Sequence, residues 1–386
     1  MRDSRPHACV FTFHRLPDMR IFDRQVRALL RAGYRVTLIG RSDRRPYAGV
    51  GVNDIMVPDR AGGVWRRIVT LLRIARHALQ TEADVYHLHD PDLLPVGVLV
   101  RALRGRPVVY DIHEIYRVKF QLKAQRSPLL ARLITAAFAC VEDVCARLIG
   151  HCSCVYEESV EHFSRLGCRC VLTPNYASRA IYADREPTDA EWAARSHKLV
   201  YVGVVNALRG ALVMIEAARR AREHVPDLEL IVTRRFYKPS DEKPVMELLA
   251  RPGYENLVHW VPDTPGDELP AVVRQAAVGL SPLQDVGQYR LAVPSKFFDY
   301  MAESCAILAS DLPPSRKYVG EVGCGVLVPP ADVDAWAGAM VTLLSDPDRT
   351  RVLGRVGRAA FLERFNWEAY EPAFVRFYDE LSQVRS

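Results

Sequence analysis

Short apolar runs alternate with amphipathic segments along this 386-residue chain, and this alternation is the feature that most constrains its fold. In the first half, the apolar runs predict strands at residues 8–13, 34–39, 85–89 and 107–111. Segments with apolar residues at helical spacing predict the helices between them, at 65–79 and 93–103 and after the helix cap Asp18. A strand–helix–strand order of this kind predicts a parallel sheet with helices on both faces.

A second unit with the same alternation begins near Lys198. Its predicted strands are at 198–203, 228–232, 257–260, 278–282 and 306–309. The fold class is therefore α/β, with two doubly wound, Rossmann-like domains. We place the domains at 1–180 and 198–365, a linker at 181–197, and a C-terminal helix at 366–386 that can return to the first domain.

The bulk properties exclude several classes of protein. The net charge of +6 suits an anionic nucleotide substrate or an anionic membrane surface. The sequence has no basic block interleaved with aromatic residues, so we expect no nucleic-acid partner. The sequence contains no run of about 18 apolar residues, which a transmembrane helix would need. The apolar run at residues 8–13 is too short for the core of a signal peptide, so we expect a cytoplasmic protein. The spacing of Cys152 and Cys154, and of Cys168 and Cys170, favours core thiols over a zinc site.

Polar, ionisable residues follow three predicted strands of the first domain. Ligands of doubly wound sheets bind at the carboxyl ends of strands, so these residues are candidates for a binding site. They are His14 with Arg15, His89 with Asp90, and His113 with Glu114.

A second candidate site lies in the segment PSKFFDYMA at 294–302. Ser295 is placed to cap a helix that follows Pro294, and Lys296 with the first-turn amides would face an anion. Asp299 lies one turn further on, where it can accept hydrogen bonds from a vicinal diol. The segment suits a phosphorylated, hydroxyl-rich small molecule.

Three motifs in this order resemble those of the retaining GT-B glycosyltransferases of family 4. They are VYHLHDPDLLPVG at 85–97, YDIHE at 110–114, and the segment 294–311. The resemblance implies two domains facing across a deep cleft, with a nucleotide-sugar donor, UDP-linked in our interpretation, on the C-terminal domain. It implies an acceptor hydroxyl of a glycan, lipid carrier or small natural product on the N-terminal domain. Transfer with retention, without a metal or a resident cofactor, is also implied.

The resemblance assigns donor-binding roles to several residues. Arg209 and Lys296 match the cations that contact the diphosphate, with Ser295 beside them, and Asp299 matches the carboxylate that binds the ribose. Arg234 or its neighbour Arg235 stands where relatives carry a glycine-rich turn, and either could contact the diphosphate. The first acid of the family's E-x₇-E pattern is missing, because Leu291 occupies its place. The sequence therefore leaves the donor sugar undetermined.

In the N-terminal domain, His113 matches a family histidine at the reacting centre. Strand alternation places Asp111, two residues earlier, on the same side if the extended geometry continues, so Asp111 can orient the imidazole. Arg15, His89 and Asp90 are assigned to the acceptor side. Residues 65–76 form a basic amphipathic helix that either packs on the sheet or contacts anionic lipid at the inner face of a membrane. The sequence does not determine the oligomeric state.

Two other functions remain open from the sequence. A sugar-nucleotide epimerase shares the two-domain layout and would turn over the donor without an acceptor. A non-catalytic nucleotide-sugar-binding subunit would bind the donor and transfer nothing. The sequence argues against a dinucleotide oxidoreductase, because no G-x-G-x-x-G follows the strand at 8–13.

Overall fold

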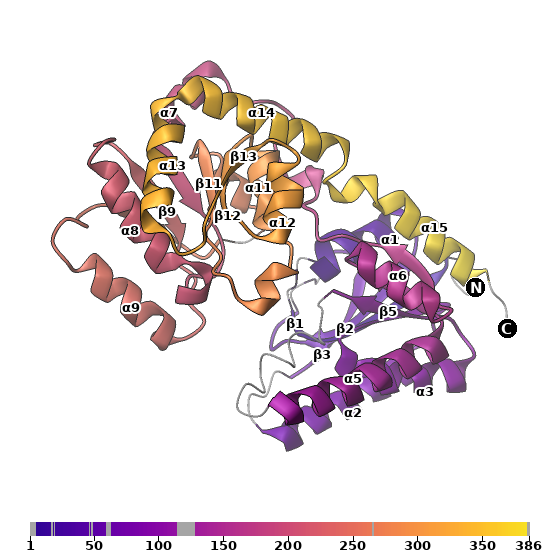
Figure 1. Cartoon of the computed structure of the whole chain (residues 1–386). Helices are drawn as coiled ribbons and strands as arrows, with labels where there is room; N and C mark the ends of the chain where they lie inside the picture. The colour runs from indigo at the N-terminus through magenta and orange to yellow at the C-terminus, as the bar shows by residue number, and fades with distance from the viewer. Residues whose placement is uncertain are drawn as a thin grey trace. The chain divides into compact units, whose positions relative to one another are not determined.

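The chain is divided between two α/β units, each built on its own parallel sheet (Figure 1). Unit 1 combines Met1–Asn175 with Trp367–Ser386, and unit 2 is Tyr176–Asn366. The computed structural model describes residues 5–16, 18, 20–45, 47, 49–58, 63–113, 128–264 and 266–383. The predicted fold class, two doubly wound Rossmann-like domains, is confirmed.

The sheet of unit 1 has seven parallel strands in the order β3-β2-β1-β4-β5-β6-β7. The central strands β4 and β5 are buried along their whole length, including the polar side chains of His87, His89 and Asp111. The strand bounds are β1 His7–Arg15, β2 Arg35–Arg41, β3 Val52–Val57, β4 Val85–His89, β5 Val108–Ile112, β6 His151–Cys154 and β7 Arg169–Leu172.

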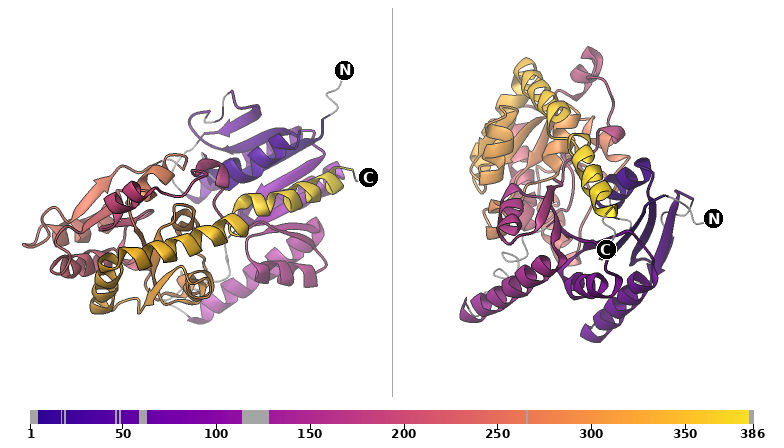
Figure 2. Two further views of the ribbon diagram at one scale, coloured as in Figure 1. Left: turned by 90° about the horizontal axis from the view of Figure 1, so that it is seen from above. Right: turned by 90° about the vertical axis from the view of Figure 1, so that its right-hand side faces the viewer.

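Helices cover both faces of this sheet (Figure 2). One face packs against α2 (Val64–Gln80), α3 (Leu94–Arg104), α5 (Pro128–Ile149) and α6 (Glu157–Arg165). The other face packs against a π-helical turn, η1 (Arg20–Val26), its continuation α1 (Arg27–Arg31), and α15 (Glu371–Ser382).

The C-terminal helix α15 is part of unit 1. Its residues Phe374 and Phe377 lie in the same buried cluster as Val10 of β1. The hydroxyl of Tyr378 contacts the ring of His87, and the hydroxyl of Tyr34 donates a 2.9 Å hydrogen bond to Asp379. The last helix therefore completes the covering of one face of the first sheet.

Unit 2 has a six-stranded parallel sheet in the order β10-β9-β8-β11-β12-β13. Its strands are β8 Lys198–Tyr201, β9 Glu229–Thr233, β10 Val258–Val261, β11 Val278–Ser281, β12 Ala306–Ser310 and β13 Gly325–Val328. Its longer helices are α7 Asp189–Arg195, α8 Ala211–Arg222, α9 Pro239–Leu249, α11 Lys296–Ala302, α13 Val333–Ser345 and α14 Pro347–Glu363.

The local structure adds detail to the sequence expectations. Asp18 accepts a 3.1 Å hydrogen bond from the amide of Ile21, as a helix cap does, although the first turns are π-helical. Strand β3 was not expected, because it is an edge strand that carries polar Asn53 and Asp54 among its apolar residues. The segment expected as a linker, 181–197, contains α7 and lies within unit 2. Among the described residues, no helix has the combined length and apolarity that would cross a membrane.

Candidate functional site

Asp111, at the end of β5, is the centre of a buried polar network in unit 1. The Arg20 guanidinium donates to both of its carboxylate oxygens, at 3.0 and 3.1 Å. Gln25 and Ser153 donate to the same carboxylate at 2.7 and 2.9 Å. Burial opposes ionisation, but the charge of Arg20 and the neighbouring histidines hold the pKa of Asp111 well below its usual value. The network therefore holds a fixed anion at the carboxyl end of β5.

Three histidines surround this anion. The Nδ1 atom of His113 lies 3.3 Å from Oδ1 of Asp111, which confirms the same-side placement that strand alternation predicts. His89 and His87 approach the carboxylate at 3.5 and 3.6 Å. Burial, together with the charge of His87, lowers the pKa of His89 to about 4, so its imidazole is neutral at physiological pH.

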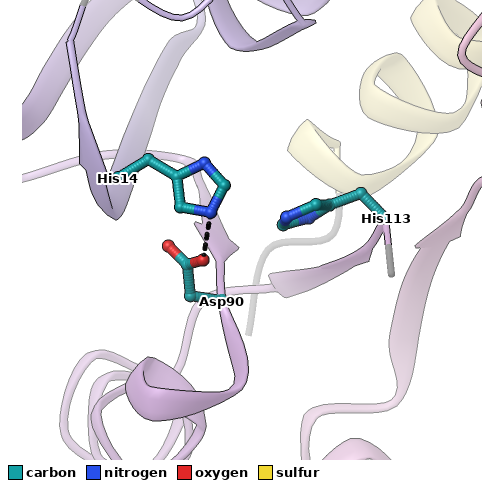
Figure 3. A group of neighbouring side chains, drawn as sticks. All are labelled: His14, Asp90 and His113. Carbon is teal, nitrogen blue, oxygen red and sulfur yellow. Dashed lines mark ion pairs between the residues drawn. The ribbon is translucent and has the colours of Figure 1, made fainter. Parts of the chain in front are cut away.

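A second cluster, His14, Asp90 and His113, lies at the ends of β1, β4 and β5 (Figure 3). His14 Nε2 lies 2.7 Å from Asp90, and its Nδ1 lies 3.4 Å from Asp18. The hydroxyl of Thr12 donates to Asp90 at 3.1 Å. The rings of His14 and His113 meet edge to face with centroids 5.0 Å apart. These contacts place His113 beside a charged pair.

The cluster has the residue types of a two-histidine, one-carboxylate metal site, since its ligand atoms lie within 4.8 Å of one another. Its protonation does not suit a metal. Burial opposes the charge on His14, but hydrogen bonds to Asp18 and Asp90 raise its pKa to about 10. A metal ligand must be a neutral imidazole, and both ring nitrogens of His14 face carboxylates instead. The geometry favours an imidazolium–carboxylate pair.

The other predicted residues of unit 1 have different surroundings. Arg15 is exposed and its guanidinium lies 3.8 Å from Asp43. His89 has no exposed surface, so in this structure it contacts Asp111 and not solvent. Glu114 lies outside the described residues. Of the residues assigned to the acceptor side, Asp90 shares a cluster with His113, in which the candidate ligand atoms lie within 4.8 Å of one another.

In unit 2, the side chain of Lys296 is buried without a hydrogen-bond partner among the described residues. Its Nζ lies 3.5 Å from the ring centroid of Tyr201, and the residue is 6% exposed. Burial, and after it the charge of Arg209, lowers the pKa of Lys296 well below its usual value. A buried ammonium without a hydrogen-bond partner is costly, and a nearby anion would reduce that cost.

Arg209 is positioned by the turn that leads into α8. The side chain of Asn206 accepts a 2.8 Å hydrogen bond from the Arg209 amide, and Gly210 follows with φ +77°. A Cβ on Gly210 would lie 1.8 Å from the carbonyl oxygen of Pro282, so only glycine fits there. The Arg209 guanidinium lies 6.0 Å from the ring centroid of Tyr289.

Asp299 and Ser295 lie on either side of Lys296 in sequence. The hydroxyl of Tyr182 donates a 2.5 Å hydrogen bond to Asp299 and orients its carboxylate. Ser295 occupies the N-cap position of α11, but the expectation that its hydroxyl caps the helix is wrong, because its side chain makes no capping hydrogen bond. Its φ and ψ of −58° and −28° are already helical, whereas a capping side chain needs an extended backbone.

Arg234 follows β9 and forms a 2.8 Å ion pair with Glu242 of α9. Its neighbour Arg235 lies 3.7 Å from Asp263. Both arginines are about half exposed and paired with acids of unit 2. The charges of Arg209 and Asp299 both act on the pKa of Lys296, which groups these three residues. Arg234 is paired with Glu242 instead.

Sequence reasoning missed three residues that shape these sites: Arg20, Tyr182 and Tyr201. Arg20 lies 91 positions from Asp111, and Tyr182 lies 117 positions from Asp299. Neither pairing has a local signal in the sequence. Tyr201 is the last residue of β8, which pairs with β11, the strand that precedes Lys296 in the chain. That pairing could have been inferred only from the sheet order.

Comparison with known proteins gives consistent matches along the chain. The family model described as "Glycosyl transferase 4-like domain" matches residues 20–176, and the one described as "Glycosyl transferases group 1" matches residues 196–346. The MMP α-(1→4)-mannosyltransferase of Mycolicibacterium hassiacum is 26% identical over 320 residues, which cover 80% of this chain and 74% of that protein. The D-inositol 3-phosphate glycosyltransferase of Pseudarthrobacter chlorophenolicus is 25% identical over 375 residues, 90% of this chain and 86% of that protein.

Solved structures share the fold over nearly the full length. Sucrose-phosphate synthase from Thermosynechococcus elongatus matches with a TM-score of 0.72 at 19% identity, covering 98% of this chain and 99% of that one. Anabaena HepE in complex with UDP and glucose matches with a TM-score of 0.72 at 14% identity, covering 97% and 100%. With both halves matched in order, the chain belongs to the family 4 glycosyltransferases of the GT-B fold.

Proposed function

We propose that this glycosyltransferase moves a sugar, with retention of configuration, from a UDP-sugar to an acceptor hydroxyl. The observation that carries the donor assignment is the buried ammonium of Lys296, which has no hydrogen-bond partner among the described residues. A diphosphate supplies the missing anion. HepE, a structural relative, is described in complex with UDP and glucose, which supports this choice of nucleotide.

Lys296 and Arg209 would stabilise the charge that builds on the diphosphate as the sugar departs. Fixed cations stabilise such a charge best when they need not reorganise during the reaction. Gly203 borders the ammonium, because a Cβ there would lie 3.8 Å from Nζ of Lys296, and it leaves the backbone open to a phosphate. In this proposal the two cations do the work of a divalent metal, and the reaction requires no resident cofactor.

Asp299 would accept hydrogen bonds from the ribose hydroxyls. The Tyr182 hydroxyl donates a 2.5 Å hydrogen bond to this carboxylate and orients it. Ser295 and Arg234 would make weaker contacts with the donor. The Ser295 hydroxyl makes no helix-capping hydrogen bond and could bind the donor directly, whereas Arg234 would first have to break its ion pair with Glu242.

On the acceptor side, His113 would contact the reacting centre, and Asp111 would orient its imidazole from 3.3 Å. Asp90 and Arg15 would bind the acceptor, while the buried His89 supports Asp111 from behind. The acceptor attacks the face from which UDP leaves, and the departing phosphate takes the acceptor's proton. Among the relatives are a mannosyltransferase and a D-inositol 3-phosphate glycosyltransferase, and these names favour a sugar or polyol hydroxyl as acceptor.

We also propose that the chain works in the cytoplasm, where residues 65–76 contact the inner face of a membrane. Trp65 on α2 is 75% exposed and Leu72 is 64% exposed, so this helix does not bury its full apolar face on the sheet. Arginines lie between these residues, as they do in helices that bind anionic lipid.

The decisive experiment is a thermal-shift screen of UDP, GDP and TDP and their sugars, followed by a transfer assay with candidate acceptors. We expect UDP to raise the melting temperature of the wild type, since a ligand of the native state stabilises it. His113→Ala should keep the UDP shift and lose transfer. Turnover of the UDP-sugar to a second UDP-sugar without acceptor would favour the epimerase, and full transfer by His113→Ala would remove His113 from the mechanism.

A further inference from the structure

Large apolar side chains are exposed on one side of unit 1. Twelve of the twenty exposed large apolar side chains among the described residues belong to α2, α3 and α5. The three helices cover the same face of the sheet and lie next to one another in Figure 1. A concentration of this kind on the surface of a protein usually marks an interaction site.

Helix α5 provides the longest part of this surface. Its exposed apolar residues are Leu129, Leu133, Ile134, Val141, Val144 and Leu148. Because residues three and four positions apart share a helix face, most of these form one stripe along the helix. Leu133 is 60% exposed and Leu148 is 58% exposed.

The acid of α5 that could interrupt this stripe points the other way. Glu142 is buried and accepts a 3.0 Å hydrogen bond from the hydroxyl of Tyr110. Asp143 pairs with His162 of the neighbouring helix at 2.8 Å. The outer side of α5 therefore presents apolar groups with two arginines, Arg132 and Arg147, and no unpaired acid.

The charges of the three helices are predominantly positive. Helices α2 and α3 contain arginines and no acidic residue: Arg66, Arg67, Arg73, Arg76, Arg101 and Arg104. Together with α5, the three helices carry eight arginines against two acids, both of which are already paired. A surface that is apolar and cationic matches the interface of an anionic bilayer, where apolar groups enter the acyl boundary and arginines meet lipid phosphates.

We infer that α2, α3 and α5 form one docking surface for an anionic lipid bilayer, with α5 as its main apolar element. The inference extends the contact proposed for residues 65–76 to a surface three helices wide, and it depends on no step of the transfer reaction. A second copy of this chain is disfavoured as the occupant, because two such cationic surfaces would repel each other.

Vesicle flotation tests the inference with matched variants. We expect the full chain to float with phosphatidylcholine vesicles that contain phosphatidylglycerol, and not with phosphatidylcholine alone, with binding that weakens as salt rises. The double variant Leu133→Gln/Val144→Gln should bind about tenfold more weakly. A loss of this size is expected when at least one aliphatic side chain no longer enters the lipid. Val352→Gln, at an exposed position of α14 in unit 2, should bind as the wild type does.

A label reports directly whether α5 meets the lipid. Among the described residues, Cys140 is the one exposed cysteine, and it lies on α5 among the residues of the apolar stripe. An environment-sensitive fluorophore on Cys140 should shift to the blue with the anionic vesicles, while the same label in Cys140→Ser/Val352→Cys should not.

Three outcomes would overturn the inference. They are no shift at Cys140 when the protein floats, equal binding to neutral vesicles, or a dimer in light scattering that the α5 double variant abolishes. The UDP-induced thermal shift should be the same in all these variants. Its loss in the wild type would count against the proposed function and not against the docking surface.

Discussion

The ammonium of Lys296 lies 3.5 Å from the ring centroid of Tyr201, and after burial the charge of Arg209 has the largest effect on its pKa. A cation–π contact of this kind offsets only part of the cost of burying an ammonium. The charge of Arg209 adds to that cost, because it opposes a second positive charge nearby. The free protein therefore carries a destabilised group, which a bound diphosphate would stabilise.

Replacing Lys296 by Met should raise stability and abolish donor binding together. Methionine fills a similar volume without a polar atom, so the free energy of unfolding should rise by about 1–2 kcal/mol. Urea denaturation measures the first effect, and the UDP-induced shift in melting temperature measures the second. A variant that is less stable than the wild type, or that keeps the UDP shift, would contradict this role for Lys296.

Binding of UDP should also take up protons. Burial lowers the pKa of Lys296 in the free protein, and a bound diphosphate would raise it again. Titration calorimetry in buffers of different ionisation enthalpy gives the number of protons exchanged. We expect net uptake at pH values between the lowered pKa of Lys296 and its ordinary value, whereas the absence of uptake there would mean that Lys296 is already charged before binding.

The same shift gives the free protein a pH dependence of stability. Between the lowered folded pKa of Lys296 and its unfolded value of about 10.4, the unfolded chain binds more protons than the folded chain. Stability should therefore rise with pH in that window, as far as this group is concerned. Lys296→Met should remove this contribution from the slope, which urea denaturation over a pH series can measure.

Gly210 is a position where a single methyl group should disrupt the donor site. An Ala Cβ would lie 1.8 Å from the Pro282 carbonyl oxygen, and φ of +77° is unfavourable for alanine. We expect Gly210→Ala to lose about 2–3 kcal/mol or more of stability, together with UDP binding. Gly338→Ala is the matched control, because a Cβ there meets nothing within 4 Å inside α13, and it should gain about 1 kcal/mol.

The parts of the structure that could be predicted from the sequence depend on local pattern. Strands such as β4 and β12 are short apolar runs bounded by helices, so the doubly wound sheets followed from periodicity. The closeness of Asp111 and His113 followed from strand alternation. These features need no knowledge of which distant segments meet.

The supporting contacts could not be predicted, because tertiary packing creates them. Arg20 lies in a segment that reads as an amphipathic helix, and its π-helical turn on one face of the sheet brings it to Asp111. His14 looked like one of several polar residues at strand ends, and its raised pKa depends on Asp18 and Asp90 together. The exposure of the α5 stripe was also hidden, because the same residues would suit a buried helix.

Asp111→Asn tests the buried network of unit 1. The amide keeps the shape of the carboxylate but leaves the guanidinium of Arg20 without its anion in a buried site. Breaking a buried ion pair in this way should cost about 3–5 kcal/mol in a urea titration. Asp143→Asn is the control, because its pair with His162 is more exposed and should cost less than about 1 kcal/mol. Equal losses in the two variants would contradict a special role for Asp111.

His14→Gln should show a pH dependence of the opposite sign to that expected for Lys296. Hydrogen bonds to Asp18 and Asp90 outweigh the effect of burial and raise the folded pKa of His14 to about 10, from an ordinary value of 6.5. The unfolded chain loses this proton first, so the stabilisation is complete below pH 6.5, declines above it and is gone above about pH 10. The difference in unfolding free energy between the wild type and His14→Gln should follow this course in urea titrations at several pH values. A difference that stays constant or grows with pH would mean that His14 is neutral in the folded protein, and the cluster with Asp90 and His113 would then meet the protonation requirement of a metal site.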